Sequence, residues 1–362
     1  MTAVMSRFHS LKIKSITRET PDCVSLAFEV PAELRETFRY QPGQYLTLRR
    51  EHQGEELRRS YSISSSPLDE EWRVAIKKVP GGRFSTLAVD DGLRVGDLLD
   101  VLPPQGRFSP SLHPSQARRY ALFAAGSGIT PLLSIARTVL LTEPGSHVYL
   151  VYGNRGRNSI IFKEQIEGLK NKFLGRLSVY HILSRAQGDS DLFFGRVDQA
   201  KTAQLLRQLI PAASLDESFI CGPEEMIHGV RQALADAGVA PEKIHFELFA
   251  SDSGAAKTAA PPRPVGEDDQ KSQVTVRLDG RAYRLDMSFY GDTVLDAALA
   301  AGIDAPYSCK NGMCSTCLGR VTAGTAAMDV NYSLSAEEVA KGYVLTCQAR
   351  PTSPEVTVDF DQ

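Results

Sequence analysis

The chain has 362 residues, of which 42% are hydrophobic and 23% charged, as expected for a globular protein of two or three domains. Its formal net charge of -2 excludes the basic footprint of a nucleic-acid-binding protein. The charge is uneven, because residues 273–362 carry 7 Lys+Arg and 11 Asp+Glu. An acidic C-terminal part is typical of a docking surface steered by charge, or simply of a solvated face.

The N-terminus has no apolar core and no small-residue cleavage site, so we expect no signal peptide. The most apolar stretch, residues 120–142, is interrupted by glycines, a proline and an arginine, which favours a phosphate-binding loop over a membrane span. Four of the six cysteines fall in the last 54 residues, and without an export signal this clustering indicates metal rather than disulfides. We therefore expect a cytoplasmic protein that binds neither membrane nor nucleic acid.

The first predicted domain covers residues 1–113. Short alternating runs, such as residues 24–30 and 45–48, are separated by turn sequences such as Pro42-Gly43 and Pro80-Gly81-Gly82. Runs of this length between proline and glycine turns predict an antiparallel β-barrel or sandwich.

The second predicted domain covers residues 114–249, where strands alternate with helices. Thr130 is the expected N-cap of the first helix, with Pro131 at its first position. Repeated β–α units of this length predict a doubly wound α/β domain with a parallel sheet. The expected strands are residues 120–125, 148–152, 177–183, 218–221 and 244–248, and the expected helices are residues 130–141, 160–172, 198–209 and 223–237.

Residues 250–272 are rich in Ala, Pro and charge and are predicted to be a flexible linker. The third domain, residues 273–362, begins with two strands flanking Asp279-Gly280, a strong hairpin signal. A helix is expected at residues 293–301, closed by Gly302, and a strand at residues 356–358.

The strongest chemical signal is a set of four cysteines, Cys309, Cys314, Cys317 and Cys347. Their C-x4-C-x2-C spacing with a distant fourth cysteine matches plant-type [2Fe–2S] ferredoxins, in which four thiolates hold two irons. Asn311 and Gly312 suit the tight loop because both tolerate positive φ, and the loop's backbone N–H groups could turn toward the cluster. The alternative is a four-cysteine zinc site, which usually draws on two separated C-x2-C pairs.

A second signal, Arg59-Ser60-Tyr61-Ser62, lies among the barrel strands. The motif resembles the R-x-Y-S sequence of the ferredoxin–NADP⁺ reductase superfamily, which implies FAD, although FMN occurs in a related branch. The resemblance implies that Arg59 forks onto a flavin phosphate, Tyr61 stacks on the isoalloxazine, and Ser62 hydrogen-bonds near flavin N5. The superfamily's second flavin segment, whose glycines approach the pyrophosphate, is matched here by Ile76, Lys77, Gly81, Gly82, Ser85 and Thr86.

Two further motifs resemble the superfamily's nicotinamide site. The first, a G-x-G-x-x-P sequence at a strand-to-helix turn where phosphates bind, contains Gly126, Gly128, Thr130 and Pro131. The second, C-G-P at a later strand end, contains Cys221, Gly222 and Pro223. Taken alone, Cys221 would be read as a buried small hydrophobe. The resemblance makes Tyr61, Ser62, Thr130 and Cys221 the catalytic candidates and places an aromatic near the flavin, for which Phe249 is the candidate.

Ser184 and Arg185 follow a predicted strand where the adenosine ribose should lie. In NADP-type relatives a Ser-Arg pair at this place holds the 2′-phosphate, whereas an NAD site favours an acidic residue. Arg155 and Arg157 add positive charge nearby. These residues predict NADPH rather than NADH; the alternative is that the arginines only serve solubility.

The C-terminal domain as a whole, with MDVNYSL at residues 328–334 and GYVLTCQ at residues 342–348, closely resembles the reductase family of phenylacetyl-CoA ring epoxidases. Relatives often carry Gly-Gly where this chain has Asn311-Gly312. The resemblance implies a β-grasp ferredoxin domain and electron flow from NADPH through FAD and [2Fe–2S] to a di-iron oxygenase. Alternatives are the reductase of a Rieske-type or steroid hydroxylase system, and a non-catalytic redox sensor, which the intact motifs disfavour.

Overall fold

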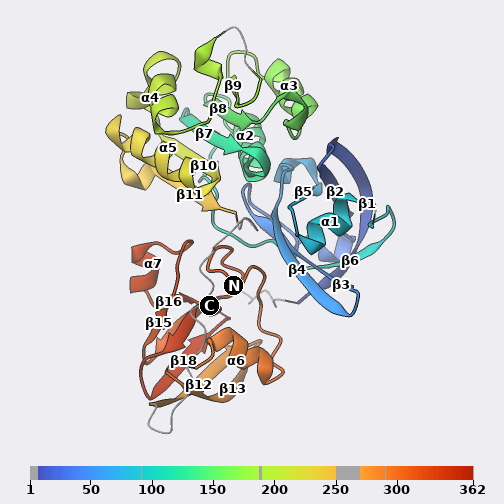
Figure 1. Cartoon of the computed structure of the whole chain (residues 1–362), viewed down its shortest axis with the longest axis vertical. Helices are drawn as coiled ribbons and strands as arrows, with labels where there is room; N and C mark the ends of the chain where they lie inside the picture. The colour runs from blue at the N-terminus through green and yellow to red at the C-terminus, as the bar shows by residue number, and fades with distance from the viewer. Residues whose placement is uncertain (1–6, 91, 187–189, 250–269, 290, 362) are drawn as a thin grey trace. The chain divides into compact units, whose positions relative to one another are not determined.

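The computed structural model describes residues 7–90, 92–186, 190–249, 270–289 and 291–361 (Figure 1). These residues form two compact units. One unit contains residues 7–9, Thr47–Ser60 and the described residues from Gln270 onward. The other contains Ser10–Leu46 and Tyr61–Phe249.

A six-stranded antiparallel sheet forms the barrel, in the order β4-β3-β6-β1-β2-β5. Almost all of β2 is buried, although its sequence alternates. The reason is that its residue Cys23 and Ala75 of β5 pack into the same core as the helices of the nicotinamide domain. The strands are β1 (His9–Thr20), β2 (Cys23–Glu29), β3 (Tyr45–His52), β4 (Glu55–Ser62), β5 (Trp72–Lys77) and β6 (Leu98–Val101), and helix α1 (Arg83–Val89) packs on β5.

The second sheet is parallel, with the order β11-β10-β7-β8-β9, and confirms the expected doubly wound domain. The chain builds outward through β8 and β9 and then returns to place β10 on the other side of β7. The carboxyl ends of β7 and β10 therefore flank the switch point, where doubly wound sheets bind ligands. The strands are β7 (Arg119–Ala125), β8 (His147–Asn154), β9 (Leu177–Leu183), β10 (Glu217–Gly222) and β11 (Ile244–Leu248).

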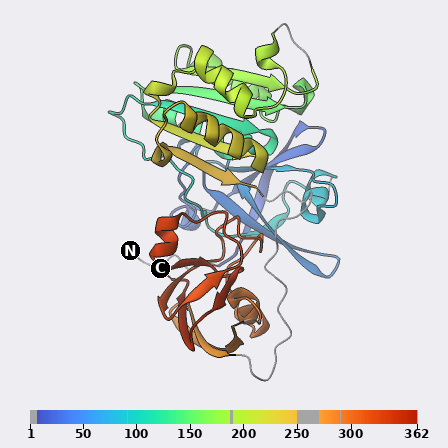
Figure 2. The same ribbon diagram turned by 60° about the vertical axis from the view of Figure 1, so that its left-hand side comes forward.

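Helices cover both faces of this sheet (Figure 2). Alternate residues of β7 divide between two cores: Leu122 lies with α2 (Ile129–Thr142) and α3 (Lys163–Lys172). Phe123 lies with α4 (Gln199–Gln208) and α5 (Glu224–Asp236). A strand buried on both faces in this way reads as a continuous apolar run, which is how the sequence presents it.

Two predicted helix starts were wrong. The N-cap of α2 is Gly128 rather than Thr130, because the 3₁₀ turn η3 (Gly126–Gly128) leads directly into the helix. Thr130 instead donates its Oγ1 proton to the Ser127 carbonyl at 3.0 Å. Helix α3 begins at Lys163 rather than at residue 160, because Phe162 takes a left-handed φ of 59° that helical backbone does not allow.

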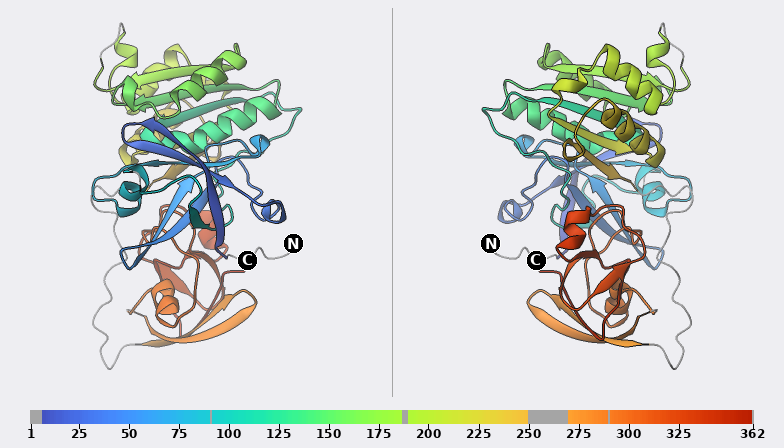
Figure 3. Two further views of the ribbon diagram at one scale, coloured as in Figure 1. Left: turned by 90° about the vertical axis from the view of Figure 1, so that its right-hand side faces the viewer. Right: turned by 90° about the vertical axis from the view of Figure 1, so that its left-hand side faces the viewer.

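The C-terminal domain is an α+β fold around the mixed sheet β13-β12-β18-β14-β16 (Figure 3). The Asp279-Gly280 hairpin is confirmed, with φ of 53° and 71° at the two turn residues. Thr293 caps α6 (Val294–Ala300) by accepting the Asp296 N–H. The other elements are β12 (Lys271–Leu278), β13 (Arg281–Ser288), β14 (Leu318–Ala323), β15 (Ala326–Met328), α7 (Ala336–Ala340), β16 (Tyr343–Leu345), β17 (Ala349–Pro351) and β18 (Glu355–Asp359).

The predicted linker, residues 250–272, falls mostly outside the described residues, and β12 begins at Lys271, close to the linker's predicted end. The domain boundaries at residues 113 and 249 stay predictions. Within the described part of the chain, no helix combines the length and apolarity that crossing a bilayer would require.

Candidate functional site

The two nicotinamide motifs touch at the switch point. A Cβ added to Gly128 would lie 2.1 Å from the Cys221 carbonyl oxygen, so only glycine allows η3 to approach the end of β10 this closely. Gly126 has a φ of 55°, and its carbonyl accepts the Tyr152 hydroxyl at 2.9 Å. The other residues of the two motifs are close in sequence to Gly128 and Cys221; they are Thr130, Pro131, Gly222 and Pro223.

A half-buried carboxyl group that sequence reasoning missed, that of Glu247, lies beside this contact. Glu247 lies on β11, opposite Cys221 in the strand register. Its Oε2 accepts the Ser62 hydroxyl at 3.4 Å. The sequence offered one signal, an acidic residue within the last predicted strand of the parallel sheet. Only the strand order shows that this strand lies beside the strand that ends in C-G-P.

The surroundings keep both Glu247 and Cys221 uncharged near neutral pH. Burial raises the pKa of Glu247 to about 8, against the opposing effect of the Ser62 hydrogen bond. Burial, and then the nearby Glu247, raises the pKa of the Cys221 thiol well above its usual range. At pH 7 this corner of the site therefore offers a protonated carboxyl, a thiol and the Ser62 hydroxyl to a bound cofactor.

The two flavin segments also lie together. The rings of Tyr61 and Phe84 are 5.7 Å apart, which joins the R-x-Y-S strand to the second segment at α1. Ser85 closes that segment's turn, because its Oγ donates to the Gly82 carbonyl and accepts the Val79 N–H, both at 3.1 Å. The arrangement fits FAD: a Cβ at Gly81 would meet no described atom within 4 Å, so its backbone is open to a phosphate.

The other predicted flavin residues have varied surroundings. Arg59 is exposed, and its Nη1 donates to the Arg58 carbonyl at 2.7 Å. The Ser60 hydroxyl lies 3.0 Å from that of Thr47. The Ile76 side chain is fully buried in the barrel, so only its backbone remains for a ligand. Lys77 pairs with Asp22 at 3.7 Å, and Thr86 lies within α1.

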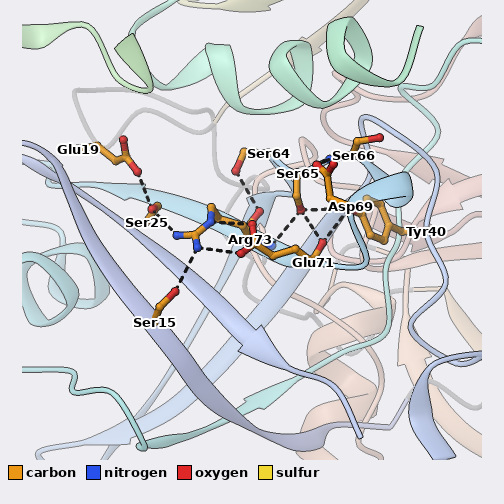
Figure 4. A network of polar contacts seen from close by, with 10 residues as sticks. All are labelled: Ser15, Glu19, Ser25, Tyr40, Ser64, Ser65, Ser66, Asp69, Glu71 and Arg73. Carbon is orange, nitrogen blue, oxygen red and sulfur yellow. Dashed lines mark hydrogen bonds and ion pairs between the residues drawn. The ribbon is translucent and has the colours of Figure 1, made fainter. Parts of the chain in front are cut away.

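A polar network centred on Arg73 holds the chain that follows the R-x-Y-S motif (Figure 4). The guanidinium donates to Ser15 and Ser25 at 3.1 and 2.9 Å and forms two hydrogen bonds with the Glu71 carboxylate. The Arg73 N–H donates to the Ser65 hydroxyl at 3.1 Å. The network thus ties three barrel strands to the segment that leaves β4 just after Ser62.

The same segment is fastened to α2 of the nicotinamide domain. The Ser65 carbonyl accepts the Ser134 hydroxyl at 2.6 Å, and Asp69 pairs with Arg137 at 2.7 Å. Because α2 begins at the G-x-G turn, these bonds fix the flavin strand relative to the nicotinamide motif. Orientation of two reactants is what a hydride-transfer site must supply.

Three arginines line a cavity of about 530 Å³ at the carboxyl ends of β8 and β9. They are Arg155, Arg157 and Arg185; the other polar side chains of the lining are those of Asn158, Ser159 and Asp22, the last being its one acidic residue. The backbone holds the two strand ends together, because the Arg185 N–H donates to the Arg155 carbonyl at 2.8 Å. The Ser184 N–H similarly donates to the Asn154 carbonyl at 2.9 Å. The cavity is cationic and suits a phosphate group.

The four cysteines of the C-terminal domain converge as two pairs, Cys309 with Cys314 and Cys317 with Cys347. No three His, Cys, Asp or Glu side chains among the described residues gather as they would around one metal ion. Two sulfur pairs are the arrangement that a two-iron cluster takes, with two thiolates for each iron.

In each pair one thiol ionises more readily than the other: the shared hydrogen bond, followed by burial, raises the pKa of Cys314 and of Cys317 well above the usual range. The pKa of Cys309 is lowered to about 6. The largest cause is a hydrogen bond from the Cys314 thiol, and backbone N–H groups, including that of Asn311, add to it. A thiol hydrogen bond from Cys317 likewise lowers the pKa of Cys347. Thiolates are the form that binds metal, so the donor set fits the cluster.

Positive φ falls at Gly312 as expected, but at Lys310 and Ser315 instead of Asn311, with φ of 73°, 54° and 55° respectively. Lys310 is held in this conformation from outside the loop. Its Nζ pairs with Asp296 of α6 at 2.9 Å, and its carbonyl accepts the Gln348 amide at 2.9 Å. Asn311 tolerates a positive φ but does not adopt one, because contacts with other elements, rather than residue type, set the backbone there.

Comparison with known families agrees with this geometry along the chain. The oxidoreductase FAD-binding domain family matches residues 10–109, and the oxidoreductase NAD-binding domain family matches residues 122–232. The 2Fe–2S iron–sulfur cluster binding domain family matches residues 276–352, a span that includes all four cysteines. These matches favour the iron–sulfur interpretation over the zinc site.

Whole-length relatives have the same order of domains. The chain is 44% identical over 357 residues to a subunit of the 1,2-phenylacetyl-CoA epoxidase of Escherichia coli, covering 99% of both chains. It is 37% identical to the ferredoxin reductase component of a 3-ketosteroid-9-alpha-monooxygenase from Rhodococcus rhodochrous, covering 98% of this chain and 97% of the relative. The chain belongs to the family of flavin and iron–sulfur oxygenase reductases.

A solved structure of phthalate dioxygenase reductase has the same fold, with a TM-score of 0.59 at 21% identity and 98% coverage of both chains. An oxygenase reductase of this family is an NAD(P)H-dependent oxidoreductase that uses FAD and a [2Fe–2S] cluster. When bound, these cofactors supply hydride acceptance and single-electron transfer, whereas the chain's own residues bind and orient them. Phe249, the predicted aromatic neighbour of the flavin, packs against the core around α2.

Proposed function

We propose that this oxygenase reductase passes electrons from NADPH, through FAD and the cluster, to a di-iron oxygenase that epoxidises phenylacetyl-CoA. The observation that carries the proposal is the 44% identity to the 1,2-phenylacetyl-CoA epoxidase component over nearly the full length of both chains. We propose the cytoplasm as its location, because all six cysteines are free and a thiolate-held cluster needs a reducing compartment.

The site residues divide by task. Arg59, Ser60, Tyr61, Ser62 and the glycine segment would bind FAD, and the G-x-G and C-G-P motifs would hold the nicotinamide. Ser62, Thr130 and Cys221 would orient the reacting ring, with Tyr61 covering the flavin. Glu247 would retain a proton beside the Ser62 hydroxyl. Cys309, Cys314, Cys317 and Cys347 would ligate the cluster.

The preference for NADPH rests on the cavity lined by Arg155, Arg157 and Arg185. A 2′-phosphate carries up to two negative charges, and arginine forks onto phosphate with charge-assisted hydrogen bonds. No acidic residue follows β9 directly, where an NAD site would present one to the ribose hydroxyls; Ser184-Arg185 stands there instead.

Arg185→Ala tests the nicotinamide preference. We expect KM for NADPH to rise about tenfold or more, because one charge-assisted hydrogen bond contributes roughly 1.5–3 kcal/mol, while KM for NADH changes little. Steady-state kinetics with a flavin-accepting dye measures both constants. Arg207→Ala, an exposed arginine on α4, is the matched control and should change neither. Equal effects of Arg185→Ala on both nucleotides would remove the NADPH assignment.

Reconstitution tests the acceptor. The purified reductase, NADPH and the di-iron oxygenase of a phenylacetyl-CoA epoxidase should together consume phenylacetyl-CoA, and omission of the reductase should stop the reaction. The 37% identical 3-ketosteroid relative defines the second candidate, so the oxygenase of a steroid hydroxylase belongs in a parallel assay. Turnover only with the steroid oxygenase would reject the epoxidase assignment.

A non-catalytic redox sensor would have the same cofactors but no turnover. Anaerobic stopped-flow mixing with NADPH separates this possibility from the reductase. We expect rapid bleaching of the flavin band followed by reduction of the cluster. A flavin that stays oxidised for minutes would favour the sensor.

A further inference from the structure

Gln348 directly follows the predicted ligand Cys347 and is completely buried. Its Nε2 donates to the Lys310 carbonyl at 2.9 Å, across the cysteine loop, and to the Cys347 sulfur at 3.8 Å. Its Oε1 is buried without a hydrogen-bond partner among the described residues. A buried amide with one unsatisfied atom is costly, so the bond made by its other end points to a role in the loop.

The peptide that Gln348 holds also carries a donor to a sulfur. The Lys310 carbonyl and the Asn311 N–H belong to one planar trans peptide and therefore point in opposite directions. On the far side, the Asn311 N–H lies 3.3 Å from the Cys309 Sγ. Fixing the carbonyl from one side thus aims the N–H at the thiolate on the other.

This peptide needs an external restraint. Lys310 is in the left-handed region with φ of 54°, which a residue with a side chain leaves readily unless contacts hold it. Rotation of the peptide would move the Asn311 N–H away from the sulfur. The Lys310–Asp296 ion pair holds the side chain, but only Gln348 bonds the carbonyl in the described loop.

We propose that Gln348 sets the reduction potential of the cluster through both hydrogen bonds of its Nε2: it aims the Asn311 N–H at the Cys309 sulfur, and it donates directly to the Cys347 sulfur. Hydrogen bonds to the sulfurs stabilise the more negative, reduced cluster and raise its potential. The inference rests on the proposed ligation by Cys309 and Cys347, which iron and sulfide content tests separately.

Thr346 provides a matched control on the other side of Cys347. It is equally buried, and its Oγ1 donates to the Cys317 carbonyl at 2.8 Å. The N–H of that peptide, on Leu318, goes to the Ser315 carbonyl rather than to a sulfur. Thr346→Val therefore removes a comparable buried hydrogen bond without affecting a sulfur donor.

The experiment is a redox titration of the intact holoprotein, followed by the EPR signal of the reduced cluster. We expect Gln348→Met to lower the reduction potential of the cluster. The equilibrium constant for reduction of the cluster by a redox dye should fall about tenfold, which corresponds to about 59 mV for a one-electron couple. The g-values should shift too, and the deuterium sensitivity of the Fe–S(Cys) stretching bands should fall. Thr346→Val should leave all three unchanged.

An unchanged potential in Gln348→Met, or an equal shift in Thr346→Val, would overturn the proposal. Gln348→Asn, which keeps an amide but is too short to reach Lys310, gives a second reading if the first variant does not take up its cluster. If neither Gln348 variant holds a cluster while Thr346→Val does, the residue is needed for assembly, and the tuning role is rejected. Absence of iron and sulfide from the unaltered protein would instead reject the ligand assignment.

Discussion

Glu247 carries a carboxyl group that the fold keeps protonated near neutral pH. Its pKa is raised to about 8, chiefly by burial, and its only described side-chain partner is the Ser62 hydroxyl. Between about pH 4.5 and 8 the folded protein therefore holds a proton that the unfolded chain has released. Stability must fall as pH rises through this range, because the unfolded state binds fewer protons.

Glu247→Gln should remove this pH dependence. The amide has the size of the protonated acid but cannot ionise, so the variant should gain stability over the parent as pH rises from 5 to 8. After discounting for partial exposure, we expect a gain of roughly 2 kcal/mol. Thermal unfolding of both proteins at pH 5 and pH 8 measures it. A difference that is the same at both pH values would show that Glu247 ionises normally.

Residue-level prediction from sequence succeeded where chemistry requires a residue type and failed where packing decides. The cysteine spacing alone indicated a two-iron site, and the described sulfurs do form two pairs. Glu247 was missed because an acid in an apolar strand has no local signature; only the register beside Cys221 brings it to the site. The positive φ of Lys310 could not be predicted, because the contacts that hold Lys310 come from Asp296 and Gln348, distant in sequence.

At the scale of elements, the turn between β7 and α2 is positioned by contact with β10. Gly128 ends this turn and lies against the backbone of Cys221. The sequence identified the strand–turn–helix unit correctly, because its apolar run and glycines are local. It assigned the cap to Thr130 because the close approach of another strand, which requires glycine at position 128, is not visible locally.

Gly128→Ala should therefore separate the two nicotinamide motifs. Its Cβ would lie 2.1 Å from a backbone oxygen, which cannot move as a side chain could, so η3 or the end of β10 must shift. We expect a loss of about 1–3 kcal/mol in stability and weaker nicotinamide binding. Chemical unfolding and a binding titration measure these. Gly168→Ala in α3, where an added Cβ meets nothing within 4 Å, is the control and should be neutral or slightly stabilising. If Gly128→Ala behaves like Gly168→Ala, the contact has no such role.

At the scale of the whole molecule, the chain places two chemistries in separate cores. Tyr61, Ser62 and the nicotinamide motifs belong to one compact unit, in which Ser65 and Asp69 bond to α2, whereas Arg59 and Ser60 are grouped with the other unit. Two of the four cysteines, Cys317 and Cys347, belong to the core of the C-terminal domain, where they pack with β12 and β18. Hydride acceptance and single-electron delivery therefore depend on different sets of residues.

Cys347→Ser tests this separation. A serine hydroxyl is a poor ligand for iron, so the variant should lose the cluster, seen as loss of iron, sulfide and the EPR signal of the reduced protein. NADPH oxidation with ferricyanide, which takes electrons from the flavin directly, should stay within about twofold of the parent rate because none of its residues lies in the C-terminal core. Transfer to an iron–sulfur-dependent acceptor should fall by at least about a hundredfold, the upper end of the effect of disturbing a metal site. If ferricyanide reduction fell together with the cluster content, flavin binding would depend on the cluster domain, and the two chemistries would form one cooperative unit.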